Sequence, residues 1–133
     1  MKDNIALIGI GGNIYDIYEA LKIKNYSVIG YVDNFRDKSV EDSLSLNYLG
    51  NDRTFASNNK FSTLITFAGI GKEIDLRKKI FDIYKSSCIS FIFPNTSISE
   101  FSDISGKGVL IFGNCTIKSF SNIEENVFIN TGT

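Results

Sequence analysis

The chain has 133 residues, of which 43% are hydrophobic, and a formal net charge of −1. This length supports one globular core rather than a disordered segment. The 14 lysines and arginines are scattered along the sequence, which lacks the clustered basic face of a nucleic-acid-binding protein. The apolar run at residues 5–10 is too short for a signal peptide, and no stretch approaches membrane-spanning length. We therefore exclude DNA and RNA as partners and expect a cytoplasmic protein.

The two cysteines do not form a metal-binding cluster. Cys88 and Cys115 both lie in apolar surroundings and are far apart in the sequence. We expect buried free thiols. Because the 133 residues contain no histidine to activate a thiol, we do not expect a cysteine nucleophile.

The first ninety residues alternate between strand and helix patterns. A buried strand is predicted over 4–10, a glycine turn over 9–13 and a helix from 14 to about 25. A second strand over 27–32 is followed by a polar loop over 35–45 and a short segment over 52–56. A third strand over 64–68, a helix over 72–84 and a last strand over 88–93 complete the pattern. Strands separated by helices indicate a parallel sheet, so we predict an α/β fold with a small Rossmann-like domain at residues 1–94.

The carboxyl ends of the predicted strands carry the candidate ligand-binding residues, because open parallel sheets bind ligands there. Glycines at the end of the first strand let the backbone approach a phosphate, and the following helix presents its N–H groups to it. Asp33, after the second strand, is placed to accept hydrogen bonds from a ribose or a base. The candidate residues are Gly9, Gly11, Gly12, Asn13, Asp33, Asn34, Gly71 and Lys72.

The glycine turn has two interpretations. The dinucleotide-binding motif requires a third glycine where this chain has Ile14, so a nicotinamide cofactor is not expected. The turn either binds a different phosphate-containing ligand or is a tight strand-to-helix connection that needs glycine for steric reasons alone.

The tail has a six-residue repeat, with isoleucine at 98, 104, 111, 117, 123 and 129 and a single one-residue slip. A small side chain precedes each isoleucine by two positions. Such a repeat is typical of a β-solenoid, whose units bury their apolar sides by stacking on one another. The alternative is a meander of hairpins with glycines in its turns, but residues 117–129 lack the alternation that a meander requires.

The order of these parts resembles the hexapeptide-repeat sugar acyltransferases, of the sialic acid O-acetyltransferase type and the type that N-acetylates UDP-linked 4-amino sugars. The resemblance is carried by five segments in sequence order: Tyr31-Val32-Asp33-Asn34, Leu49-Gly50-Asn51-Asp52, Ala68-Gly69-Ile70-Gly71, Arg77-Lys78-Lys79 and Ile129-Asn130-Thr131-Gly132.

The resemblance implies an enzyme of bacterial surface-glycan biosynthesis that uses acetyl-CoA. Residues 1–94 would bind a UDP-linked amino sugar, and residues 95–133 would begin a left-handed β-helix of the kind that usually trimerises and holds acetyl-CoA. The glycine turn with Asn13 would line the diphosphate, Asp33 and Asn34 the nucleoside, and Gly71 with Lys72 the far wall of the cleft. Many relatives have histidine or phenylalanine at the position of Asn13.

The sequence departs from the family in lacking the histidine that serves as general base. In relatives this residue follows the segment matched by Asn130-Thr131-Gly132, and the β-helix continues beyond about two turns. We therefore expect the 133 residues to be inactive by themselves, as the sugar-nucleotide-binding portion of an acetyltransferase, and monomeric or loosely oligomeric. The alternatives are a non-catalytic sugar-nucleotide-binding or scaffolding module, and a regulatory domain that binds nucleotides or CoA.

Other polar residues are not expected to be catalytic. The carboxylates at 100, 103, 124 and 125 fall at predicted corners of the solenoid, where such groups face water. Tyr15 and Tyr18 are expected to pack on the first helix, with Tyr15 near the ligand cleft.

Overall fold

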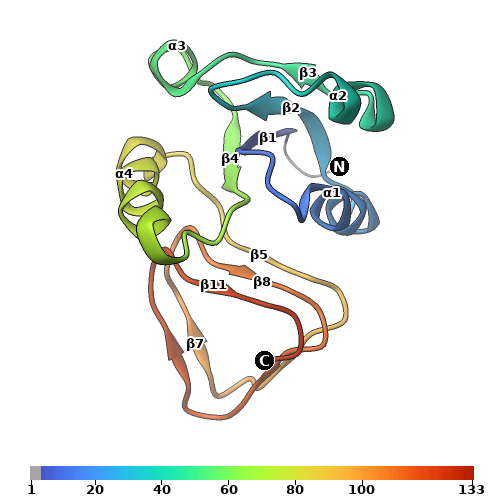
Figure 1. Ribbon diagram of the computed structural model, residues 1–133. Coiled ribbons are helices and arrows are strands. Elements are labelled where there is room, and N and C mark those ends of the chain that lie inside the picture. Colours follow the sequence, from blue (N-terminus) through green and yellow to red (C-terminus); the bar gives the residue numbers. More distant parts are fainter. Residues whose placement is uncertain (1–3) are drawn as a thin grey trace.

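The computed structural model describes residues 4–133, with a parallel sheet and its helices in one part and a coil of two-residue strands in the other (Figure 1). The sheet has the order β3-β2-β1-β4. Its strands are β1 (Asn4–Ile8), β2 (Ser27–Val32), β3 (Asn47–Tyr48) and β4 (Ser62–Ile65). All three pairings are parallel, which confirms the predicted α/β class.

Side chains alternate between the two faces of this sheet, and helices cover both. Ile5 and Leu7 of β1 pack with α1 (Ile14–Ile23), whereas Ile8 packs on the opposite face with α4 (Ile74–Tyr84). This alternation follows from the two-residue period of a strand. α1 buries Ile14 and Ile17 at helical spacing, as the sequence predicts.

The polar loop predicted over 35–45 is wrong, because this segment contains helix α2 (Lys38–Leu44). The Asp37 side chain caps the helix by accepting a hydrogen bond from the Val40 N–H at 3.2 Å. The buried residues of α2 are Val40 and Glu41, so its apolar face is too short to give a helical period. Helix α3 (Asp52–Ala56) occupies the short segment predicted over 52–56.

β1 and β4 end earlier than predicted, whereas β2 ends at Val32 as predicted. β1 ends at Ile8 because Gly9 has a φ of +93°, and β4 ends at Ile65, ahead of a loop in which Gly69 has a φ of +71°. A 3₁₀ turn, η1 (Gly71–Glu73), precedes α4. The buried residues of α4 are Arg77, Ile80, Phe81 and Tyr84.

Residues 91–133 wind into successive circuits, here called the coil, that contain seven short strands. Each strand pairs in parallel with the strand that comes three places before or after it in the chain. The strands are β5 (Phe91–Ile92), β6 (Ser97–Ile98), β7 (Asp103–Ile104), β8 (Leu110–Ile111), β9 (Thr116–Ile117), β10 (Asn122–Ile123) and β11 (Phe128–Ile129). β8 lies between β5 and β11, β6 pairs with β9, and β7 pairs with β10. Each isoleucine of the six-residue repeat ends one strand and stacks on another isoleucine, as Ile98 does on Ile117. Among the described residues of the tail, every strand pairing is parallel, unlike a meander of hairpins.

The strand predicted over 88–93 does not join the first sheet, although it was predicted as the last of the alternating elements. Cys88 makes an isolated bridge to Thr63, and β5 pairs with β8 of the coil. The coil therefore begins to stack before residue 94, and the predicted division of the chain at that point stays a prediction.

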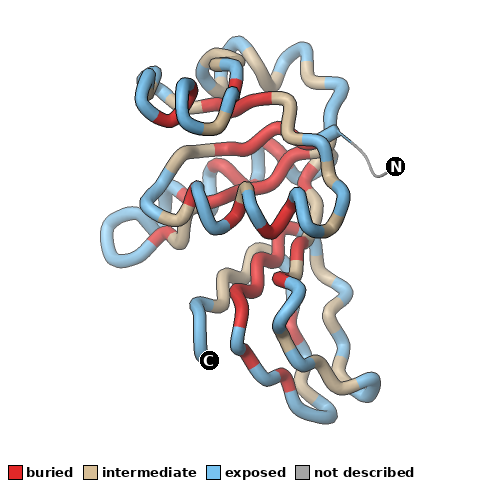
Figure 2. Tube along the Cα trace, turned by 90° about the vertical axis from the view of Figure 1, so that its right-hand side faces the viewer, coloured by how far each residue is buried: buried red, intermediate tan, exposed pale blue. Residues whose placement is uncertain are grey.

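The outer side of one face of the coil packs against the sheet and its first helix. Leu110 points out into the core that contains α1, whereas Ile111 points into the interior of the coil with the repeat isoleucines. Both parts of the molecule contain buried residues, which are red in Figure 2, and β8 contributes Leu110 to one core and Ile111 to the other. Cys88 and Cys115 are buried free thiols, as predicted. Among the described residues, no helix is both long enough and apolar enough to cross a membrane.

Candidate functional site

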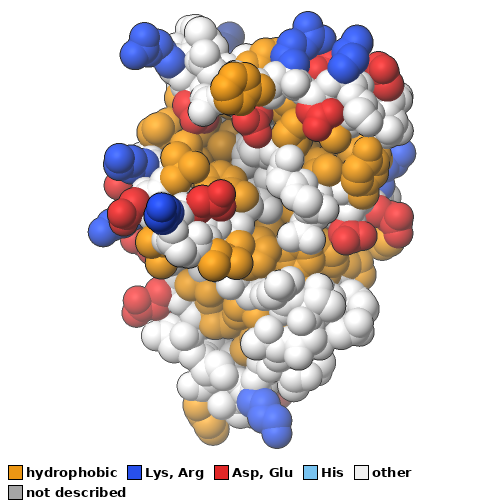
Figure 3. All heavy atoms as spheres, viewed as in Figure 1, with side chains coloured by type: hydrophobic (Ala, Val, Ile, Leu, Met, Phe, Trp, Pro, Cys, Tyr) orange, Lys and Arg blue, Asp and Glu red, His pale blue; other side chains and the backbone are white. Residues whose placement is uncertain are grey.

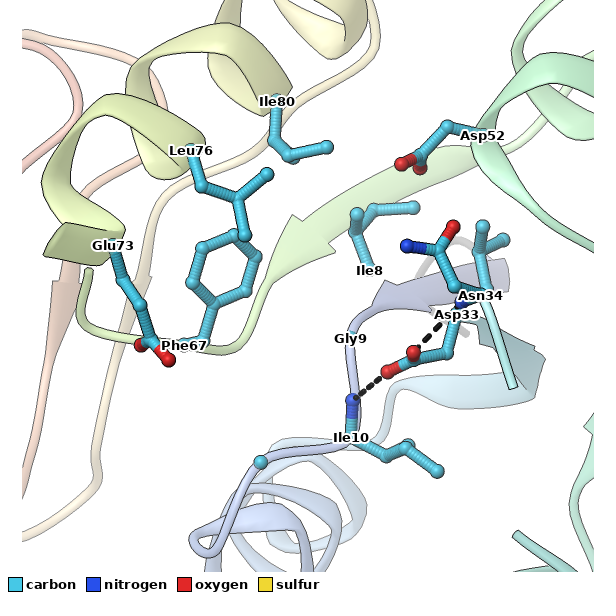
Figure 4. Close-up of a pocket in the computed structure, with 12 residues that line it drawn as sticks. Ile8, Gly9, Ile10, Asp33, Asn34, Asp52, Phe67, Glu73, Leu76 and Ile80 are labelled. Atoms are coloured by element: carbon cyan, nitrogen blue, oxygen red, sulfur yellow. Dashed lines mark hydrogen bonds between the residues drawn. The ribbon is translucent and has the colours of Figure 1, made fainter. Parts of the chain in front are cut away.

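A cavity of about 250 Å³ opens at the carboxyl ends of β1, β2 and β4. In Figure 4, the Phe67 and Leu76 side chains stand across it from Asp33 and Asn34. The residues that line it are Ile8, Gly9, Ile10, Gly11, Val32, Asp33, Asn34, Asp52, Phe67, Glu73, Leu76 and Ile80. The cavity is where the sequence predicts ligand binding.

Gly9 begins the glycine turn and is required by the fold. Its φ of +93° disfavours any other residue, and a Cβ there would lie 3.0 Å from Phe67 Cδ1. The Gly9 N–H donates to the Val32 carbonyl oxygen at 2.8 Å, and the Thr66 hydroxyl donates to the Gly9 carbonyl oxygen at 2.7 Å. The turn is thus fixed between the ends of β2 and β4.

Gly11 and Gly12 have no comparable steric requirement. A Cβ on Gly11 would come no closer than 3.9 Å to Phe67, and a Cβ on Gly12 would meet nothing within 4 Å. Among the described residues, no acceptor takes the N–H groups of Gly11, Gly12 or Asn13. These donors lie at the start of α1, where the helix dipole favours an anion.

Asp33 connects the end of β2 to the glycine turn. Its Oδ2 accepts the Ile10 N–H at 3.2 Å and its Oδ1 accepts the Asn34 N–H at 2.7 Å (Figure 4). The Asp33 backbone is held from the other side, since the Tyr48 hydroxyl donates to its carbonyl oxygen at 2.8 Å. The carboxylate is therefore held at the cavity wall with little freedom to rotate.

Asp52 and Glu73 add two further carboxylates to the lining. The Tyr84 hydroxyl donates to Asp52 Oδ1 at 2.8 Å. Burial raises the pKa of Tyr84, and the hydrogen bond to Asp52 raises it further, so the hydroxyl remains a proton donor. Among the described residues that line the cavity there is no lysine or arginine. Such a lining suits hydrogen-bond donors, such as ribose hydroxyls or the N–H groups of a base.

The structure brings four of the eight predicted site residues into the cavity lining: Gly9, Gly11, Asp33 and Asn34. Gly12 and Asn13 follow at the start of α1 without lining the cavity. Gly71 and Lys72 lie exposed in η1 and are not part of the lining.

Sequence reasoning missed Asp52, Phe67, Glu73 and Leu76 as lining residues. Phe67 follows β4, so its position after a strand end could have indicated it. Asp52 lies in one of the segments that carry the resemblance, but it lines the same cavity as Asp33 only because α3 packs at this edge of the sheet.

The remaining candidates lie away from this cavity. The carboxylates at 100, 103, 124 and 125 are exposed, as expected. Burial raises the pKa of the Cys88 thiol, which opposes a nucleophilic role. Tyr15 is exposed on α1 and does not line the cavity.

Comparison with known proteins gives matches only at the level of structure. Neither a scan against protein-family models nor a search of curated proteins found a match. Solved structures, in contrast, resemble nearly the whole chain.

One similar structure is a mutant of perosamine N-acetyltransferase from Caulobacter crescentus in complex with CoA and GDP-perosamine. It has 22% sequence identity and a TM-score of 0.75, over 97% of this chain and 60% of that chain. Another is the acetyltransferase domain of PglB from Neisseria gonorrhoeae FA1090 in complex with acetyl coenzyme A. It has 19% identity and a TM-score of 0.80, over 99% of this chain and 63% of that chain.

These likenesses show that the chain shares the fold of acetyltransferases, over less than two thirds of their length. Both structures hold CoA or acetyl-CoA, which confirms acetyl-CoA as the cofactor of the enzymes that the sequence resembles. The first structure also holds GDP-perosamine, an amino sugar linked to a nucleotide, which is the class of ligand that the resemblance implies.

Proposed function

We propose that this chain is the sugar-nucleotide-binding portion of an acetyl-CoA-dependent sugar acetyltransferase of bacterial surface-glycan biosynthesis. The observation that carries the proposal is the cavity at the carboxyl ends of β1, β2 and β4, in a fold shared with acetyltransferases. In this proposal residues 1–94 are a Rossmann-like domain, and residues 95–133 begin a left-handed β-helix of hexapeptide repeats. The location is cytoplasmic, where sugar nucleotides and acetyl-CoA are both present.

The nucleoside would occupy the cavity. Asp33 and Asp52 offer acceptors to ribose hydroxyls or base N–H groups, and the Phe67 ring offers an apolar surface for stacking. A diphosphate would be repelled by the three carboxylates of the lining, so it would lie outside them on the free N–H groups of Gly11, Gly12 and Asn13. This arrangement favours a nucleoside diphosphate sugar, with either uracil or guanine as the base.

The coil of this chain, residues 91–133, does not fit the phosphates of acetyl-CoA. Coenzyme A carries several phosphate charges, whereas the coil over 91–133 has two cations, Lys107 and Lys118, both exposed. Figure 3 shows few charged side chains over the visible face of the coil. Since the 133 residues also contain no histidine, we assign them no step of acetyl transfer.

Calorimetric titration with UDP, GDP, a UDP-linked 4-amino sugar, NAD and acetyl-CoA tests the proposal. We expect binding of nucleoside diphosphate compounds. We expect Asp33→Ala to weaken it about 10–100-fold, because hydrogen bonds to a charged group contribute about 1.5–3 kcal/mol.

The matched control is Asp42→Ala, which removes a carboxylate from the exposed side of α2, where it pairs with Lys38 at 3.8 Å. It should bind like wild type. Binding of NAD or acetyl-CoA alone, or unchanged UDP and GDP binding by Asp33→Ala, would contradict the proposal.

A further inference from the structure

Arg77 is a buried cation that touches both parts of the molecule. It lies on α4 with 4% of its surface exposed. Its Nη1 donates to the carbonyl oxygen of Phe67, in the loop after β4, and its Nη2 donates to that of Gly108 in the coil at 3.1 Å. The guanidinium also lies over the ring of Phe128, 5.8 Å from its centroid. One side chain therefore connects the loop beside the cavity to two successive circuits of the coil.

Holding a guanidinium in this position is costly. Burial lowers the pKa of Arg77, no described carboxylate pairs with it, and its Nε has no hydrogen-bond partner among the described residues. An apolar side chain of similar length would fill the same space without that penalty. What arginine provides here is two rigidly oriented donors that span two carbonyl groups.

The loop end of this connection reaches the cavity through Phe67. The Phe67 side chain lines the cavity. It also packs against the glycine turn, since a Cβ on Gly9 would lie 3.0 Å from its Cδ1. A fixed Phe67 carbonyl therefore helps to hold the Phe67 side chain against the glycine turn.

The coil end of the connection is equally constrained. Gly108 has a φ of +70°, and a Cβ there would lie 2.8 Å from Phe81 and 3.3 Å from the Cys88 sulfur. In the loop after β4, Gly69 packs directly on Arg77, because a Cβ added to Gly69 would lie 2.6 Å from Arg77 Cβ. Neither Gly108 nor Gly69 can therefore move without repacking buried groups.

We propose that Arg77 is a positioning residue, through which the coil sets the position of Phe67 and thereby the affinity of the cavity for a nucleoside diphosphate. Arg77 does not line the cavity and acts through the Phe67 backbone. The proposal rests on the function proposed above for this cavity. The coil then influences the affinity of the cavity without contacting the ligand.

A double-mutant cycle of Arg77 and Phe67, read by the Kd for UDP and GDP, tests this coupling. Arg77→Met removes both donors but keeps an unbranched side chain, and we expect it to weaken binding about tenfold. Phe67→Ala should weaken binding too, and Arg77→Met should add nothing further in that background. Arg77→Lys, whose single ammonium cannot span both carbonyls, should behave like Arg77→Met and replaces it if that variant does not fold.

Lys78→Met, which removes the neighbouring exposed cation, is the control and should bind like wild type. Wild-type affinity in the Arg77 variants, or a full tenfold loss on top of Phe67→Ala, would overturn the proposal.

A ligand-free measurement separates this proposal from the proposed function. In NMR spectra without nucleotide, the Gly9 and Gly11 amide signals should shift in Arg77→Met and stay in place in Lys78→Met. If wild type binds neither UDP nor GDP, the proposed function fails. If the two glycine signals do not move, the positioning role of Arg77 fails, whatever binds.

Discussion

Gly9 and Gly12 belong to the same turn, but the fold needs only one of them to be glycine. Gly9 combines a positive φ with close contact to Phe67, whereas a Cβ on Gly12 would meet nothing within 4 Å. A glycine without a steric reason costs conformational entropy on folding. Its presence next to unpaired N–H groups supports a role in letting a ligand approach the backbone.

The two glycines should therefore respond differently to alanine. We expect Gly9→Ala to lower the free energy of unfolding by about 1–3 kcal/mol, because the new Cβ is strained in both φ and packing. Gly12→Ala should leave stability within about 0.5 kcal/mol of wild type and weaken binding of UDP or GDP. Urea unfolding and calorimetry measure the two effects. Equal destabilisation by both substitutions would show that the turn needs glycine for folding alone.

At the scale of elements, α2 is held to β2 by a buried hydrogen-bond network. Glu41 is 7% exposed and accepts the Tyr31 hydroxyl at 2.7 Å and Arg36 Nη2 at 2.6 Å. The Tyr31 hydroxyl in turn accepts the Asp37 N–H at 2.8 Å. Tyr31 lies two residues before Asp33, so the network supports the strand end that carries the candidate site.

This network makes the free energy of unfolding depend on pH in the acidic range. The hydrogen bonds from Arg36, and then from Tyr31, lower the pKa of Glu41 from 4.5 to about 2. A carboxyl with a lowered pKa in the folded state stabilises above its unfolded pKa, and this contribution is lost as pH falls from about 4.5 towards about 2. We expect wild type to lose stability over this range relative to Glu41→Gln, in urea unfolding at several pH values. Parallel pH profiles for the two proteins would contradict this assignment.

Elements with a clear period could be predicted from the sequence, and those that depend on distant partners could not. The isoleucine repeat placed the coil strands because each isoleucine ends one strand. α2 was missed because its two buried residues give no period, and its stability comes from capping and from Tyr31. The strand predicted over 88–93 pairs with β8 of the coil and not with the first sheet. The sequence could not indicate this pairing, because it depends on the chain completing one circuit of the coil.

At the scale of the whole molecule, the candidate site is assembled from strand ends, a loop and the start of two helices. The sequence indicated Asp33 and the glycine turn, since both directly follow predicted strands. It could not indicate Asp52 or Leu76, because these reach the cavity from α3 and α4 only when the helices pack on the sheet. Arg77 lies in one of the five segments that carry the resemblance, but its burial between the loop and the coil follows from tertiary packing.

The most direct test of the central proposal is a crystal structure of this chain grown with UDP or GDP. We expect the nucleoside in the cavity beside Asp33, with the diphosphate on the N–H groups of Gly11, Gly12 and Asn13. A nucleotide bound elsewhere on the molecule, with the cavity empty at saturating concentration, would contradict it.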